Sequence, residues 1–215
     1  MPDLELFIGN KNYSSWSFRP WLALRQNDIP FRETLVPFEF ENGNPAFKTF
    51  SPTVKVPVLK DGELTVWESL AIIEYIAEIY PDAGLLPADR FARARVRAAS
   101  AEMHSGFAAM RSAFPMNFHR PAGSLAISVS VQKDIDRVVG LWNDCLETSG
   151  GPFLFGDFTM ADAMYAPVVS RLTTYEATND PVAQAYMQRM RVLPAWQEWQ
   201  KAALDETWII AAEEV

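Results

Sequence analysis

The chain has 215 residues, of which 49% are hydrophobic and 21% are charged, and its formal net charge is −8 at pH 7. This composition is typical of a globular protein with one or two domains and excludes a disordered chain. The negative charge argues against a nucleic-acid partner. The acidic start and the lack of a long apolar run indicate neither a secretion signal nor a membrane anchor, so we expect a cytoplasmic protein.

The cysteine and histidine content limits the possible chemistry. The single cysteine, Cys145, excludes an internal disulfide, and the two histidines, His104 and His119, have no cysteine partner at a metal-ligand spacing. We therefore expect no metal site. Cys145 lies in the apolar stretch Leu141–Leu146, which predicts a buried thiol that takes no part in the chemistry.

The first 36 residues predict a strand, a helix and a second strand. Leu4–Ile8 is a short apolar run, and the apolar positions after it recur at helical spacing until Asn27. Pro20 suits the first turn of a helix but not its interior, so the helix should begin near residues 15 to 17. The β-branched and aromatic residues of Phe31–Val36 then predict a strand parallel to the first.

The next segment is too rich in Pro, Gly and Asn for a long element, and it predicts a short helix near Pro45–Phe50. Two short strands, Val56–Leu59 and Leu64–Trp67, flank Asp61-Gly62, a pair that favours a tight antiparallel hairpin. A helical pattern then runs over Ser69–Tyr80 and stops at a proline. The predicted order is βαβ, an irregular helical stretch, and ββα.

Beyond a turn-rich connector, Pro81–Pro87, the strand pattern disappears. Long helical windows follow, at residues 90–114, 125–148, 160–175 and 181–203. We therefore expect an α/β domain over residues 1–83 and an all-α domain over residues 84–215.

Several hydroxyl groups gather where the first helix should begin, in the run Asn12–Ser17. The unpaired backbone N–H groups and the dipole at a helix N-terminus favour an anion, which can be a thiolate. The alternative interpretation is an ordinary serine N-cap.

Two further segments carry a resemblance to a known family. The run Ser51–Leu59, followed by Trp67–Ile76, resembles the glutathione-binding half of glutathione transferases. The resemblance implies a thioredoxin-like first domain with a mixed sheet, glutathione as co-substrate, and a homodimer. It also implies a cis bond before Pro57, which turns the backbone N–H and C=O of Val56 toward the cysteinyl part of glutathione. X-Pro bonds are the ones that adopt the cis form at low cost.

Glu68-Ser69 is similar to the pair with which this family recognises the γ-glutamyl end of glutathione. Ser69 can offer its hydroxyl and backbone N–H to the α-carboxylate, while Glu68 can accept from the α-ammonium. The alternative is a serine N-cap beside a solvated glutamate. Lys55 either pairs with the glycyl carboxylate or lies in solvent.

The second domain also carries a family segment. Gly156–Pro167 is similar to the buried helix start of the helical domain, in which Thr159 and Asp162 form a capping box. This role is structural, so neither residue is a catalytic candidate.

Ser14-Ser15-Trp16-Ser17 is similar to the serine-rich stretch of the zeta class, with Trp16 where that class has cysteine. The match implies that the Ser14 hydroxyl donates to the glutathione sulfur and stabilises the thiolate. Ser15 is the second candidate, and Tyr13 is the choice if the site works as in tyrosine-type transferases.

An apolar pocket for the electrophile should lie between the two domains. We expect it to be lined by Tyr13 and by residues of the first long helical window, namely His104, Phe107, Met110, Arg111 and Phe114. Met and aromatic residues at this spacing also fit a plain core. Zeta-class isomerases hold a substrate carboxylate with an arginine at a position that corresponds to Thr174 here, and the nearest arginine is Arg171.

Three functions stay open at this stage. The first is a glutathione transferase or peroxidase that directs the glutathione thiolate at a small electrophile. The second is a glutathione-dependent cis–trans isomerase of the maleylacetoacetate or maleylpyruvate type. The third is a non-catalytic binding protein with the same fold, because a fold does not guarantee an activity.

Overall fold

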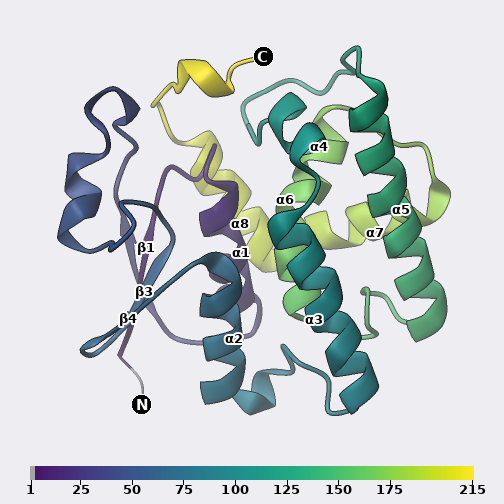
Figure 1. The fold of residues 1–215 in the computed structure, drawn as a ribbon, viewed down its shortest axis with the longest axis horizontal. Coiled ribbons are helices and arrows are strands. Elements are labelled where there is room, and N and C mark those ends of the chain that lie inside the picture. The colour runs from purple at the N-terminus through teal and green to yellow at the C-terminus, as the bar shows by residue number, and fades with distance from the viewer. Residues whose placement is uncertain (1–2) are drawn as a thin grey trace.

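The computed structural model describes residues 3–215 and places a sheet-containing part beside a helical part (Figure 1). The sheet-containing part holds β1 (Leu4–Ile8), α1 (Ser15–Gln26), β2 (Arg32–Leu35), β3 (Val58–Asp61), β4 (Leu64–Trp67) and α2 (Ser69–Ile79). Two short 3-10 helices, Phe40–Asn42 and Pro45–Thr49, lie between β2 and β3. The thioredoxin-like order predicted from the sequence is confirmed.

The four strands form one mixed sheet in the order β2-β1-β3-β4. Strand β1 is parallel to β2 and antiparallel to β3, and β3 is antiparallel to β4. Asp61 pairs with Leu64, so the hairpin loop consists of Gly62 and Glu63, one residue later than the Asp61-Gly62 pair that the sequence suggested. Gly62 has a φ of 55°, a conformation that glycine adopts without steric cost.

Two prolines modify the predicted elements. The Val56-Pro57 bond is cis, as the resemblance implied, and the β3 ladder begins only at Val58 because proline has no N–H to donate. Pro20 lies inside α1, in its second turn and not in its first. Helix α1 nevertheless begins at Ser15, within the predicted range.

The helical part holds α3 (Arg90–Ser105), α4 (Ala108–Ala113), α5 (Val129–Ser149), α6 (Met160–Thr174), α7 (Pro181–Arg191) and α8 (Pro194–Leu204). Short 3-10 turns at Pro81–Ala83 and Ala211–Glu213 lie at its two ends. Beyond residue 90, strand pairing in the described chain is limited to two isolated bridges at residues 153–157. Within residues 3–215, no helix combines the length and the apolarity that crossing a bilayer requires.

Two of the predicted helical windows are interrupted. The window 90–114 breaks because Phe107 adopts a left-handed conformation, with a φ of 58°. Gly106 permits this break, since a Cβ there would lie 2.7 Å from the Glu102 carbonyl oxygen. The last window breaks before Pro194, because a residue that precedes proline disfavours the helical conformation.

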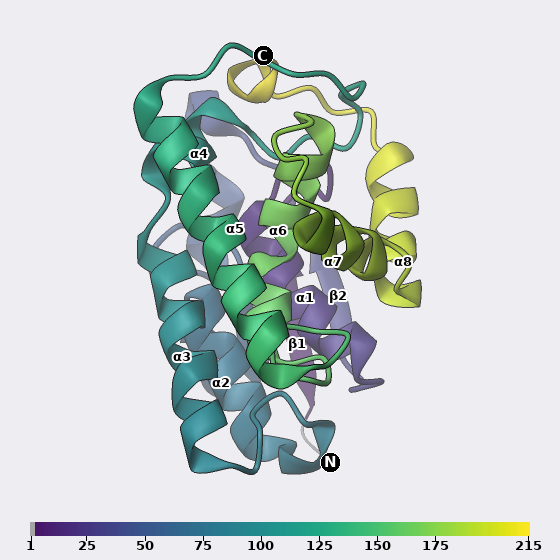
Figure 2. The same ribbon diagram turned by 90° about the vertical axis from the view of Figure 1, so that its right-hand side faces the viewer.

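Helix α6 is buried and joins the two parts of the molecule. It packs against α1, α2, α3 and α7, and Figure 2 shows it enclosed by its neighbours. Its N-terminus carries the predicted capping box of Thr159 and Asp162. The Asp162 carboxylate also accepts from the Leu154 N–H at 3.1 Å and from the Tyr186 hydroxyl at 3.0 Å. Burial raises the pKa of Asp162 to about 6.

Candidate active site

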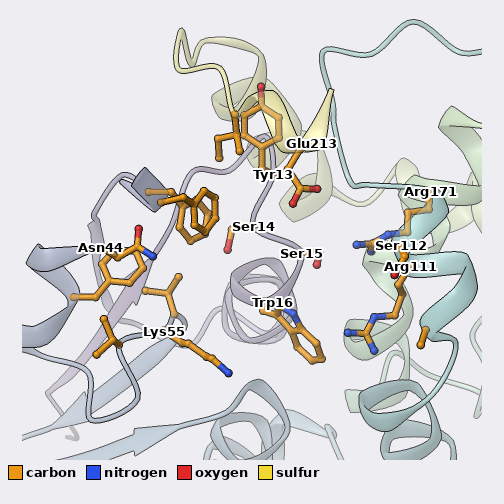
Figure 3. Close-up of a pocket in the computed structure, with 17 residues that line it drawn as sticks. Tyr13, Ser14, Ser15, Trp16, Asn44, Lys55, Arg111, Ser112, Arg171 and Glu213 are labelled. Atoms are coloured by element: carbon orange, nitrogen blue, oxygen red, sulfur yellow. The ribbon is translucent and has the colours of Figure 1, made fainter. Parts of the chain in front are cut away.

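A cavity of about 380 Å³ lies between the sheet-containing part and the helical part (Figure 3). This volume suits a small ligand. Residues from both parts and from the C-terminal segment line it: Tyr13, Ser14, Ser15, Trp16, Phe38, Phe40, Asn44, Phe47, Val54, Lys55, Val56, Ala108, Arg111, Ser112, Arg171, Ile210 and Glu213. The N-terminus of α1 therefore faces the cavity together with three cationic side chains.

Ser14 is the N-cap residue of α1, but its side chain makes no capping hydrogen bond. Its hydroxyl instead donates to the Ser17 hydroxyl oxygen at 2.7 Å, and Ser17 also accepts from the Gly9 N–H at 3.2 Å. The Ser14 hydroxyl can therefore turn its proton toward a ligand while Ser17 donates back to it. Ser17 was not among the residues selected from the sequence, although it belongs to the same serine-rich run.

The loop before α1 is held by buried polar contacts to the helical part. The Glu206 carboxylate accepts from the Lys11 N–H at 2.6 Å and from the Asn12 N–H at 3.0 Å. The Asn12 side-chain oxygen accepts from the Phe118 N–H at 2.7 Å, and its amide donates to Asn117 at 3.1 Å. These contacts fix the position of Ser14 relative to the helices across the cavity.

The opposite edge of the cavity is formed by Val54, Lys55 and Val56. Ser51 stabilises this turn with two hydrogen bonds to the Lys55 backbone. Its hydroxyl donates to the Lys55 carbonyl at 2.6 Å and accepts from the Lys55 N–H at 3.0 Å. Val54 has a φ of 56°, a strained value for a β-branched residue. Val56 lies outside the β3 ladder, which begins at Val58, and Pro57 is buried behind it.

Glu68 and Ser69 lie at the start of α2 and do not line the cavity itself. Ser69 is not the N-cap residue: Glu68 occupies that position with a φ of 69°. The Ser69 hydroxyl is buried and has no hydrogen-bond partner within residues 3–215. An unpaired buried hydroxyl is costly, and strained backbone often marks a ligand site, so both residues fit a binding role toward a polar group.

Cationic side chains gather on the helical side of the cavity. Arg111 of α4 and Arg171 of α6 line it, as Figure 3 shows. Burial, with a further contribution from Arg111, lowers the pKa of Arg171 to about 10, and burial also lowers the pKa of Arg111. Arg171 is anchored by a 2.7 Å hydrogen bond from its Nε to the Phe114 carbonyl.

Two guanidinium groups contact the Trp16 ring, those of Arg19 at 4.0 Å and Arg111 at 4.8 Å from the ring centre. Arg19 is completely buried, and its three guanidinium nitrogens have no hydrogen-bond partner in the described chain. Burial and the charges of Arg171 and Arg111 lower the pKa of Arg19 well below its usual value. Such a concentration of positive charge is stabilised when an anion binds nearby.

Two C-terminal residues complete the site, and the sequence pattern gave no signal for them. The carboxylate of Glu214 accepts from the Tyr13 hydroxyl at 2.6 Å and from the Asn117 amide at 3.0 Å. Burial raises the pKa of Tyr13, and the bond to Glu214 raises it further. Glu213 also lines the cavity, and the charge of Arg171 acts on its carboxylate.

The predicted pocket residues are only partly brought together. Tyr13 and Arg111 line the cavity, but Phe107 and Met110 do not, because both are packed in the hydrophobic core, as is Phe114. His104 lies behind Trp16, with ring centres 5.2 Å apart, and its Nε2 is 3.8 Å from the Glu68 carboxylate. The prediction that His104, Phe107, Met110 and Phe114 line this cavity is therefore wrong.

The sequence profile described as "Glutathione S-transferase, N-terminal domain" matches residues 13–79, and the one described as "Glutathione S-transferase, C-terminal domain" matches residues 89–202. The chain belongs to the glutathione S-transferase family. Together with the mixed sheet and the helical part, these matches confirm the fold class predicted from the sequence.

One curated relative and two solved structures illustrate what the chain is similar to. The rat protein maleylacetoacetate isomerase is 30% identical over 171 residues, which cover 78% of this chain and 77% of the rat protein. A glutathione transferase homolog from Burkholderia, solved with bound glutathione, has a TM-score of 0.74 at 24% identity and covers 96% of this chain and 100% of its own. A theta-class glutathione S-transferase from Xanthomonas axonopodis, also with glutathione bound, has a TM-score of 0.68 at 25% identity. The match covers 92% of this chain and 97% of the Xanthomonas chain.

Proposed function

We propose that this protein binds glutathione at the edge of the sheet, stabilises its thiolate with Ser14, and directs it at a small electrophile that carries a carboxylate. One observation carries the proposal: the Ser14 hydroxyl and the guanidinium groups of Arg111 and Arg171 line the same cavity. A thiolate site on one wall and carboxylate-binding groups on the other support this pair of reactants.

For glutathione, the supporting groups lie at the start of α2 and in the turn around Val56. The buried Ser69 hydroxyl, with the backbone N–H at the start of α2, suits the α-carboxylate of the γ-glutamyl end. The exposed Glu68 carboxylate suits the ammonium group, and Lys55 suits the glycyl carboxylate. Val56, outside the ladder, offers its backbone to the cysteinyl part between them.

For the thiolate, the supporting contacts are at the start of α1. Bound glutathione supplies a sulfur nucleophile, and the protein has to keep it ionised. A free thiol with a pKa near 8.5 is only about 3% ionised at pH 7, so a decrease of ~2 units is needed. Ser14 donates to the sulfur, Ser17 donates to Ser14, and the helix N-terminus favours the charge. Ser15 also lines the cavity and is the second candidate, whereas the Tyr13 hydroxyl is already bound to Glu214.

The arginines favour a second candidate function, a glutathione-dependent cis–trans isomerase of a conjugated carboxylate. Arg171 lies one helical turn before the position where the zeta-class resemblance placed an arginine, yet it reaches the cavity. Maleylacetoacetate isomerase activity in the rat relative is consistent with a carboxylate substrate here. Transferase and isomerase share the same first requirement, a thiolate facing a carboxylate-bearing electrophile.

The test has two stages. Calorimetric titration with glutathione checks the first half of the proposal, and no detectable binding by the folded protein would refute it. A panel of neutral electrophiles, carboxylate-bearing electrophiles and maleyl compounds is then assayed with and without glutathione. Glutathione-dependent turnover that favours carboxylates supports the proposal, and conversion of a maleyl compound without consumption of glutathione assigns the isomerase.

Binding without turnover of any compound in the panel would favour the third function, a non-catalytic binding protein. The domain boundary at residues 83/84 and the cytoplasmic homodimer stay predictions. The association state can be measured by light scattering, and independent folding of residues 1–83 by expression of that segment.

A further inference from the structure

The cavity contains an acidic group among its arginines. Arg111 and Arg171 are the guanidinium groups that line it within the described chain, and Glu213 is its one lining carboxylate there. Glu213 is half-buried and forms no direct ion pair within residues 3–215. Burial raises the pKa of Glu213, and the charge of the nearby Arg171 partly offsets this rise. The Glu213 carboxylate is therefore influenced by the charge of Arg171 but does not form an ion pair with it.

The segment that carries Glu213 is fixed on both sides of this residue. On one side, Glu206 accepts two backbone N–H groups of the loop before α1, and Ile210 is buried against the cavity. On the other side, Glu214 accepts from Tyr13 and Asn117. Figure 1 shows this segment crossing above the start of α1, and Figure 3 shows the Glu213 side chain near Arg171. The carboxylate is thus held at the cavity wall.

We infer that Glu213 is a specificity-determining residue that restricts the electrophile to one carboxylate. The inference rests on the proposed function as a transferase, and it argues against the isomerase candidate, because maleylacetoacetate carries two carboxylates. Arg111 donates one N–H to the Gly106 carbonyl at 3.1 Å and forms no ion pair within residues 3–215, so its other N–H groups can bind a substrate carboxylate. The side of the cavity near Arg171, in contrast, already has the negative charge of Glu213. A second substrate carboxylate on that side would meet Glu213, and like charges a few ångströms apart in a partly buried site repel strongly. Arg19, behind Trp16, does not reach the ligand, because it does not line the cavity.

The experiment compares three stable thioether conjugates of glutathione by calorimetry on the full chain. S-methylglutathione has no carboxylate on its sulfur substituent, S-(carboxymethyl)glutathione has one, and S-(1,2-dicarboxyethyl)glutathione has two. The variants are Glu213→Gln, which removes the charge, and Glu213→Asp, which keeps it. Glu147→Gln is the matched control. Glu147 is exposed on α5 and does not line the cavity, and its replacement changes the net charge by the same amount.

The wild-type protein should bind the monocarboxyl conjugate more tightly than the dicarboxyl one. Glu213→Gln should strengthen binding of the dicarboxyl conjugate about tenfold more than binding of the monocarboxyl conjugate, the size expected for removing one like charge. S-methylglutathione should bind equally to every variant. Glu213→Asp and Glu147→Gln should behave as the wild type.

Two negative results are distinguishable. If S-methylglutathione does not bind the wild-type protein, the proposed function fails and the inference fails with it. If all three conjugates bind but Glu213→Gln changes the affinities for the two carboxylates equally, the proposed function stands and Glu213 does not set the charge of the electrophile. An equal change in Glu147→Gln would also overturn the inference, since it would show an effect of net charge alone.

Discussion

Replacing Ser14 with alanine should raise the pKa of the bound glutathione thiol. The change removes one hydroxyl that makes no helix cap, so α1 should be preserved. A hydrogen bond to a charged acceptor contributes about 1.5–3 kcal/mol. At 1.36 kcal/mol per pKa unit, its loss corresponds to a rise of about 1 to 2 units. A thiol that is largely ionised at pH 7 in the wild-type complex would then be mostly protonated.

The assay is ultraviolet titration of the thiolate in the glutathione complex of the wild type, Ser14→Ala, Ser17→Ala and Ser15→Ala. Ser14→Ala should bind glutathione with nearly unchanged affinity but show the raised pKa and a lower turnover. Ser17→Ala should show a smaller rise, because it removes only the donor to Ser14. Ser15→Ala should shift the pKa least. A shifted pKa in Ser15→Ala with none in Ser14→Ala would refute the assignment.

Four further outcomes follow from the same contacts. Ser69→Ala should weaken glutathione binding by roughly 1 to 3 kcal/mol in calorimetry with unchanged circular dichroism. Arg111→Met should raise KM for a carboxylate-bearing electrophile at least about tenfold and leave KM for a neutral one unchanged. Tyr13→Phe should leave the thiol pKa unchanged in the same titration, because Glu214 already binds that hydroxyl. Asp162→Ala should lower the free energy of unfolding in urea by about 3 kcal/mol, because it leaves several buried donors unpaired.

Much of the fold was accessible from local patterns. Apolar periodicity and turn residues predicted the order of the strands and helices of the sheet-containing part. The predicted capping box of Thr159 and Asp162 is present in the structure. The breaks inside two helical windows were not predicted, because apolar spacing continues across them. Gly106 was the available signal for the first break, since its missing Cβ allows the close approach to the Glu102 carbonyl.

The site was predictable only where its residues are close in sequence. The serine-rich run and the turn around Val56 were found that way. Arg111 and Met110 are neighbours, yet one lines the cavity and the other is buried in the core, because the packing of α4 decides which face is covered. Glu213 and Glu214 reach the site through long-range contacts of a segment without periodicity, and no local pattern reveals such contacts.

The most direct test of the account is a crystal structure of the protein with S-(carboxymethyl)glutathione. The account predicts the γ-glutamyl end at Ser69, the sulfur within hydrogen-bonding distance of the Ser14 hydroxyl, and the added carboxylate on Arg111. A conjugate bound with its sulfur away from Ser14, or with its carboxylate turned to solvent, would contradict it.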